Sequence, residues 1–303
     1  MRYVDRKSAA VPDSLSKPSN AVRTEQAAAE LFYQTYDPTE SPRPASYEFK
    51  AYKSYDVQNA LRQLFHAKCA YCESHLGENL EVEHFRPKGG VTEEANHTGY
   101  WWLAHSWNNL LPACSGCNKK LCHHLVTEQM TKDEFERIQG KKSRKSHGKA
   151  NHFPVSGVRA TDATHRLEDE RPDLLDPTVD DPDPFLQWSR VGYFSVAIGQ
   201  AAAPDVVHRA LATINVFALN RVNLVRSRTL VLNELRVQRE EILRDLEDDL
   251  AKGGSAASLD QAMMRVGAMR RMEEPEKPYS ALAKSFIKEF IAELQAHPGL
   301  AAK

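Results

Sequence analysis

The run CSGCNKK, Cys114 to Lys120, combines two kinds of chemistry in seven residues. Two cysteines at a metal-binding spacing are followed directly by an asparagine and two lysines. Cysteine thiolates are ligands of structural zinc, whereas an amide oxygen suits a hard cation such as Mg²⁺. The segment could therefore hold zinc, begin a catalytic helix, or do both.

A second CxxC pair completes a predicted zinc site. Cys69 and Cys72 lie in CAYC, and Cys114 and Cys117 lie in CSGC, while Cys122 is left over. Two such turns supply the four ligands of a tetrahedral zinc site, and a reducing compartment favours metal ligation over disulfides. We predict a structural Zn²⁺ here. The alternatives are unrelated buried thiols, or redox chemistry, for which no thioredoxin-like pattern is present.

Polar residues lie between the two cysteine pairs and directly after the second pair. Glu83 and His84 stand at the end of a predicted strand, residues 80–85, and Asn118 follows the second pair. Histidine can activate water, since its ordinary pKa is about 6.5, and the carboxylate and amide oxygens suit Mg²⁺ or Mn²⁺. Neighbouring strand residues point to opposite faces, so the strand must end or bulge at this pair.

These elements resemble the HNH nuclease superfamily, whose pattern is CxxC, an acid–His pair followed by Pro, Asn-Leu, and CxxCN before a lysine. They stand here as CAYC, EHFRP, NNLL and CSGCNKK. The resemblance extends to the HNH nuclease subunit of Septu and retron-associated anti-phage defence systems. The phrases that carry it are MRYVDR, EVEHFRPK, YWWLAHSWNNLLPACSGCN, ERPDLLDP and TINVFALNRVNLVRSR. It covers most of the chain.

The resemblance implies a role for each polar residue of the motif. His84 would be the general base, and Glu83 and Asn118 would bind the catalytic Mg²⁺ or Mn²⁺. Asn109 would hold the His-bearing segment through hydrogen bonds, with Asn108 as a substitute. Many relatives carry Asp before the histidine, so the longer Glu83 leaves its coordination open.

A further histidine ligand is a second open question. Some HNH enzymes take one from the helix that follows the second CxxC, and His123 and His124 stand about one turn after Asn118. A solvent-facing or phosphate-contacting role is the alternative for both.

Charge must be read by segment, because the net charge of -1 excludes a globally basic coat protein. A basic run, KKSRKSHGK, follows the predicted catalytic helix, on which Lys119 and Lys120 would lie. Contacts to phosphate would give salt-sensitive affinity, whereas a solvated loop is the alternative. The predicted nucleic-acid contacts are Arg86, Lys88, Lys119, Lys120, Lys141, Lys142, Arg144 and Lys145.

The predicted fold class is α+β, mainly α, with a zinc-stapled, treble-clef-like ββα-metal core. Helical patterns occupy residues 21–37 and 54–68, and residues 185–198 suggest a hairpin turning near Gly192. The expected units are an N-terminal arm and helix (1–50), an HNH nuclease domain with the zinc site (51–160), an acidic Pro-rich linker and hairpin (161–204) and a C-terminal helical domain (205–303).

The resemblance also implies partners. A co-encoded ABC/SMC-like ATPase would control the nuclease, and in some systems a retron DNA/RNA hybrid joins. The chain has no GxxxxGK[ST] motif, so nucleotide dependence would come from a partner. The apolar stripe from Val225 to Leu250 is a candidate docking surface, or it packs inside. No long apolar run or signal peptide stands out, which predicts a soluble, cytoplasmic protein.

The sequence thus favours a metal-dependent HNH endonuclease acting in anti-phage defence, with DNA as the default substrate and RNA as the other candidate. The alternative is a zinc-stabilised nucleic-acid-binding or adaptor module without catalysis. Loss of His84 would inactivate the first and leave the second intact.

Overall fold

The computed structural model describes residues 1–17, 20–138, 140, 144–189, 195–199, 203–253 and 256–296. These residues form a mixed α+β fold that is mainly helical, which confirms the predicted class at that level. The helices are α1 (Asp13–Ser16), α2 (Asn20–Thr35), α3 (Tyr55–Leu64), α4 (Ser115–Asn118), α5 (Lys132–Ile138), α6 (Pro204–Val216), α7 (Val222–Ala251), α8 (Ala256–Met269) and α9 (Ser280–Gln295). The strands are β1 (Glu81–His84), β2 (Leu110–Ala113), β3 (Leu121–His123), β4 (Lys145–His147), β5 (Leu186–Trp188) and β6 (Ala197–Gly199).

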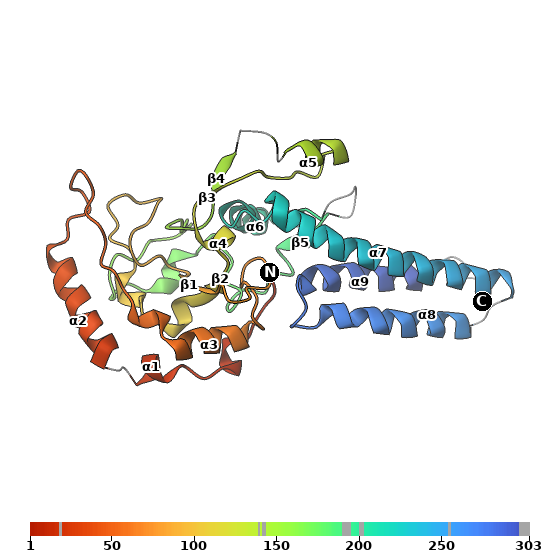
Figure 1. Cartoon of the computed structure of the whole chain (residues 1–303), viewed down its shortest axis with the longest axis horizontal. Helices are drawn as coiled ribbons and strands as arrows, with labels where there is room; N and C mark the ends of the chain where they lie inside the picture. Colours follow the sequence, from red (N-terminus) through yellow and green to blue (C-terminus); the bar gives the residue numbers. More distant parts are fainter. Residues whose placement is uncertain are drawn as a thin grey trace.

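The strands pair as β1 with β2, β3 with β4 and β5 with β6, each pair antiparallel. Figure 1 shows β1 and β2 in one half of the molecule, surrounded by α2, α3 and α4, while α7, α8 and α9 extend away as an elongated bundle. One apolar core nevertheless contains residues of all four predicted segments, from Met1 to Leu294.

Helix α3 prepares the first CxxC turn. Val57, Leu61 and Leu64 recur at helical spacing and are buried, and the helix contacts β2. It ends at Leu64, earlier than the sequence pattern predicted. His66 and Ala67 then adopt positive φ values of 52° and 54°, which turn the chain toward the first cysteine pair.

The apolar stripe of α7 packs inside the helical bundle. Val225, Leu232, Leu235, Ile242 and Leu246 are buried, and α7 contacts both α8 and α9. Of the two alternatives for this stripe, docking surface or internal packing, the structure supports internal packing.

The predicted hairpin is present as a strand pair. Leu186 faces Gly199 and Trp188 faces Ala197 across β5 and β6. The predicted turn near Gly192 lies outside the described residues.

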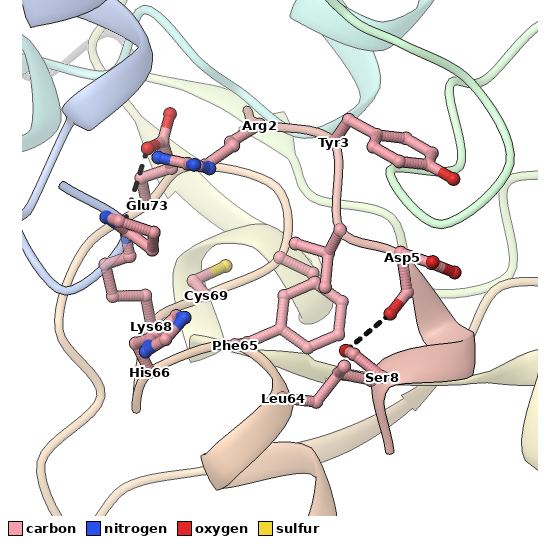
Figure 2. Close-up of a pocket in the computed structure, with 13 residues that line it drawn as sticks. Arg2, Tyr3, Asp5, Ser8, Leu64, Phe65, His66, Lys68, Cys69 and Glu73 are labelled. Carbon is pink, nitrogen blue, oxygen red and sulfur yellow. Dashed lines mark hydrogen bonds and ion pairs between the residues drawn. The ribbon is translucent and has the colours of Figure 1, made fainter. Parts of the chain in front are cut away.

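Glu73, next to the first cysteine pair, joins the N-terminus of the chain to helix α9. The Met1 ammonium donates to Glu73 at 2.9 Å, and Ser280 of α9 donates to the same carboxylate at 2.9 Å. Burial alone would raise the pKa of Glu73, but the Met1 and Lys68 ammonium groups lower it to about 2. The Lys68–Glu73 pair lies beside a cavity of roughly 180 Å³ between the segment and the end of α3 (Figure 2).

No helix in the described part of the chain has both the length and the apolar character that a membrane span needs.

Candidate zinc centre and catalytic cleft

The four paired cysteines meet at one point. The sulfurs of Cys69, Cys72, Cys114 and Cys117 all lie within 4.8 Å of one another, and those of Cys72 and Cys114 are 3.7 Å apart. Zinc–sulfur bonds of about 2.3 Å in a tetrahedron place the sulfurs about 3.8 Å apart. The cluster therefore fits a structural zinc ion, with one pair from the turn after α3 and the other from the junction of β2 and α4.

Arg221, immediately before α7, covers this cluster. Its guanidinium donates to the sulfurs of Cys117, Cys72 and Cys114 at 3.5, 3.5 and 3.4 Å. Burial opposes its charge, but the cysteine sulfurs raise the pKa of Arg221 well above its ordinary value. Four thiolates and Zn²⁺ carry a net negative charge, which this cation offsets. A Cβ at Gly116 would lie 2.9 Å from Arg221 Nε, so the glycine of CSGC makes room for it.

The polar residues of the motif surround a cleft of roughly 380 Å³ beside this centre. Glu83, His84 and Asn118 all line it. Strand β1 pairs Glu83 with Leu111 and ends at His84, so the strand stops at the acid–His pair as side-chain alternation requires.

His84 is held as a neutral imidazole. Its Nε2 lies 2.9 Å from the carbonyl oxygen of Ala104, and its ring packs edge-on against Tyr52 at a centroid distance of 4.4 Å. A carbonyl can only accept, so Nε2 carries the hydrogen and Nδ1 is unprotonated. Burial lowers the pKa of His84 to about 3, although the Ala104 carbonyl acts in the opposite direction. At neutral pH the imidazole is therefore unprotonated, and Nδ1 carries the free lone pair.

Glu83 is paired with a buried cation. Lys149 is fully buried, and its Nζ lies 2.7 Å from Glu83 Oε1. Burial raises the pKa of Glu83, and the Lys149 ammonium counteracts this effect. Because Oε1 pairs with Lys149, Oε2 is the carboxylate oxygen available to a metal ion.

Asn118, the last residue of α4, is oriented by Glu81. Its Nδ2 donates to Glu81 Oε2 at 2.8 Å, and Ser115 donates to Oε1 at 2.8 Å. Because the amide nitrogen is engaged, Oδ1 is the atom suited to a cation. The sequence analysis missed Glu81, although Glu81 and Glu83 alternate on one strand and so share a face.

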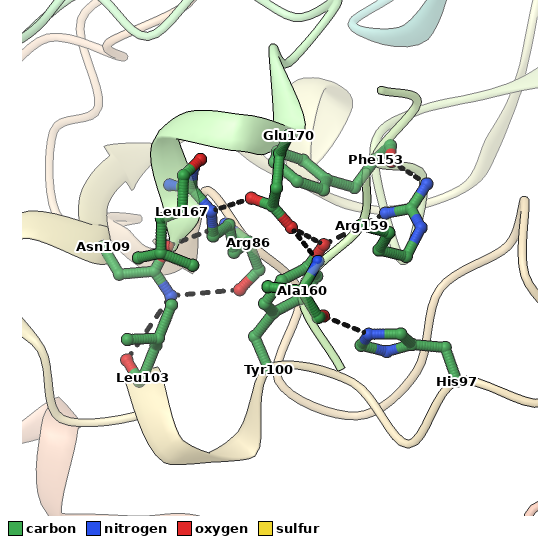
Figure 3. Close-up of polar contacts among 10 residues, drawn as sticks. All are labelled: Arg86, His97, Tyr100, Leu103, Asn109, Phe153, Arg159, Ala160, Leu167 and Glu170. Carbon is green, nitrogen blue, oxygen red and sulfur yellow. Dashed lines mark hydrogen bonds and ion pairs between the residues drawn. The ribbon is translucent and has the colours of Figure 1, made fainter. Parts of the chain in front are cut away.

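Asn109 fixes the backbone that follows the acid–His pair (Figure 3). Its Oδ1 accepts from the Arg86 amide at 2.8 Å, and its Nδ2 donates to the Arg86 carbonyl at 3.0 Å. Asn109 is buried whereas Asn108 is exposed. The geometry therefore places the bridging amide on Asn109.

The Arg86 side chain supports the same backbone. Its Nε donates to Glu170 at 2.7 Å, and the fully buried Glu170 also accepts from Tyr100 and from the Ala160 amide (Figure 3). The guanidinium thus pairs with a buried carboxylate through Nε, and its contact with phosphate stays a prediction. The sequence signal for Glu170 was its place in ERPDLLDP.

Comparison with known proteins relates the chain to an anti-phage defence system by sequence. No family model matches the chain. Septu protein PtuB of Bacillus mycoides (strain KBAB4) is 27% identical over 269 residues, which cover 83% of this chain and 80% of that protein. The chain is homologous to Septu protein PtuB.

Two shorter matches come from the same system. A Septu protein PtuB of Bacillus thuringiensis is 39% identical over 71 residues, which cover 22% of this chain and 24% of that protein. Septu protein PtuA of Bacillus mycoides (strain KBAB4) is 25% identical over 187 residues, which cover 59% of this chain and 21% of that protein.

Apart from Arg86, the predicted basic contacts divide into three groups. Lys88, Lys119 and Lys120 line the cleft. Arg144 and Lys145 are exposed at and near β4. Lys141 and Lys142 lie outside the described residues.

The segment after Asn118 differs from the sequence prediction. Helix α4 ends at Asn118, so Lys119 and Lys120 follow it rather than lie on it. His123 belongs to strand β3, with His124 directly after it, and β3 pairs with β4. Neither histidine is among the described residues that line the cleft, so the geometry lends no support to a further ligand from this segment.

Replacing Asn109 by alanine is expected to lower the free energy of unfolding by about 1–3 kcal/mol, because the backbone groups of Arg86 lose their partners. Thermal or urea unfolding measures the effect. Asn108→Ala, at the exposed neighbour, is the control and should be near neutral. Equal stability of the two variants would contradict the bridging role.

Proposed function

We propose that the chain is a metal-dependent endonuclease of the HNH type and the effector of a Septu-type anti-phage defence system. The supporting observation is the cleft, which brings Glu83, His84 and Asn118 together beside a four-cysteine cluster. The order of elements, β1, β2 and then α4, agrees with the ββα-metal core that the motif resemblance implies. Homology to PtuB supports the place of the chain in a defence system.

Each residue of the cleft has a step to perform. His84 Nδ1 takes the proton of the attacking water, for which a neutral imidazole is required. Glu83 and Asn118 would hold a divalent Mg²⁺ or Mn²⁺, which would stabilise the charge on the phosphate and the leaving oxygen. Asn109 holds the segment after His84 in register.

The lysines around the cleft suit a phosphate backbone. Lys88 lies inside it, where burial lowers its pKa, and Lys119 and Lys120 are exposed at its rim. Such contacts are independent of sequence and weaken with salt. DNA is the first candidate substrate and RNA the second.

The zinc proposed at the four cysteines is structural. A closed tetrathiolate site has no open position for substrate, so its role is to hold the start of α4 and thereby Asn118. We propose residues 51–160 as the nuclease unit and residues 205–303 as a helical unit, with the arm (1–50) and linker (161–204) packed against them.

A co-encoded partner is supported by the homology to PtuB and by the partial match to PtuA. We propose an ABC/SMC-like ATPase as this partner, with a retron DNA/RNA hybrid as an additional component in related systems. Docking would use a surface other than the α7 stripe, which is buried.

The test is incubation of the zinc-loaded chain with plasmid DNA, single-stranded DNA and total cellular RNA in Mg²⁺ or Mn²⁺. Each reaction is run with the chain alone and with the chain plus the co-encoded partner. The His84→Ala variant is tested under the same conditions. Cleavage that requires the metal and His84 would establish the nuclease and name its polymer. A folded, zinc-bound chain that cleaves nothing in any combination would favour the adaptor alternative.

A further inference from the structure

Lys149 ends the basic run KKSRKSHGK, yet its side chain points inward. Its ammonium lies 2.7 Å from Glu83 Oε1 and donates to the carbonyl oxygen of His84 at 2.8 Å. The residue is 0% exposed, in contrast to the exposed Lys145 of the same run. One buried cation therefore contacts both members of the acid–His pair.

The backbone around Lys149 is built for this approach. The Lys149 amide donates to the Cys117 carbonyl at 2.9 Å, and the Ala150 amide donates to the Asn118 carbonyl at 2.6 Å. Gly148 has a φ of +127°, and a Cβ there would lie 1.8 Å from the Lys119 carbonyl oxygen. Only a glycine allows the chain to pass so close to the end of α4. The segment thus docks on the residue proposed to bind the metal.

A buried charge is costly unless its partners are well placed, and here both partners belong to the proposed catalytic cleft. The ion pair at Oε1 restrains the Glu83 carboxylate and leaves Oε2 available to a metal ion. The hydrogen bond from Lys149 to the His84 carbonyl fixes the backbone to which the imidazole is attached. Groups that hold a metal ligand in this way typically contribute about 10- to 100-fold to metal affinity or activity.

We propose that Lys149 is a positioning residue of the cleft, which orients Glu83 toward the divalent ion and His84 toward the attacking water. This inference rests on the proposed nuclease function. It assigns no contact between Lys149 and the substrate.

The test is calorimetric titration of Mn²⁺ into the zinc-loaded full chain. Lys149→Met should weaken Mn²⁺ binding by about 10- to 100-fold. Lys252→Met, which removes an exposed lysine after α7, is the charge-matched control and should bind as the wild type does. Lys149→Arg keeps the cation near Glu83 but changes the donor geometry, so its affinity should lie between the two.

A double-variant cycle separates positioning from a general loss of structure. In a Glu83→Gln background, Lys149→Met should change Mn²⁺ affinity by less than about twofold, because its effect passes through the carboxylate. The double variant removes both buried charges, so it should fold even where Lys149→Met alone is unstable.

Three outcomes would overturn the role. Wild-type Mn²⁺ affinity in both Lys149→Met and Lys149→Arg would rule out the positioning role of Lys149 and leave the nuclease proposal intact. Tighter Mn²⁺ binding in Lys149→Met would show that repulsion between two cations dominates. A wild-type chain that neither binds Mn²⁺ nor cleaves nucleic acid would overturn both the role and the proposed function.

Discussion

Replacing His84 by alanine is expected to slow nucleic-acid cleavage by about 10²- to 10⁴-fold while the chain stays folded. The Ala104 carbonyl fixes the buried imidazole with its hydrogen on Nε2, so Nδ1 is the nitrogen with a free lone pair for the proton of water. Alanine removes this acceptor and leaves the backbone pairing of β1 with β2 in place. The loss of packing against Tyr52 should cost about 1–3 kcal/mol of stability.

Single-turnover cleavage rates, together with thermal unfolding and zinc content, measure this prediction. His165→Ala is the matched control, because His165 is exposed and pairs with Asp162 away from the cleft. The control should cleave at the wild-type rate. A His84→Ala variant that cleaves as fast as the control would show that His84 is not the general base.

Replacing Cys117 by serine is expected to release the zinc and unfold the surrounding core. Apparent binding energies of structural zinc in small zinc-binding peptides are about 10–16 kcal/mol, comparable with the whole stability of a typical protein at about 5–15 kcal/mol. Cys117 is fully buried and also accepts a hydrogen bond from Arg221. Loss of the metal would leave the Arg221 cation buried without its counter-charge.

Elemental analysis of the purified chain should give one zinc per wild-type molecule and much less than one for Cys117→Ser. Circular dichroism should show a lost or strongly lowered thermal transition for the variant. Cys122→Ser is the control, because Cys122 is exposed and outside the cluster. A Cys117→Ser chain with a wild-type transition and no metal would contradict a structural zinc.

The sequence predictions that the structure confirms rest on short-range patterns. The helices at α2, α3 and α7, the strand at β1 and the β5–β6 pair follow from local periodicity. The cysteine spacing likewise predicted a cluster, because each CxxC turn places two thiols together by itself. The stop of β1 at His84 followed from the alternation of strand side chains.

Other features depend on residues far apart in the chain. Helix α4 ends after one turn because the Gly148–Ala150 segment docks on its last carbonyls. No local pattern around Asn118 contains that contact, so the sequence predicted a longer helix. The burial of the α7 stripe similarly required the positions of α8 and α9.

The sequence by itself determined which residue types are available for chemistry: four cysteines at ligand spacing, an acid–His pair at a strand end, and an asparagine after the second CxxC. Only the tertiary structure decided which charged side chains contact these residues. Lys149 reaches Glu83, Arg221 covers the cysteines, and Arg86 pairs with Glu170 rather than facing solvent. The physical reason is that a charged side chain is buried or exposed according to the distant segment that packs against it.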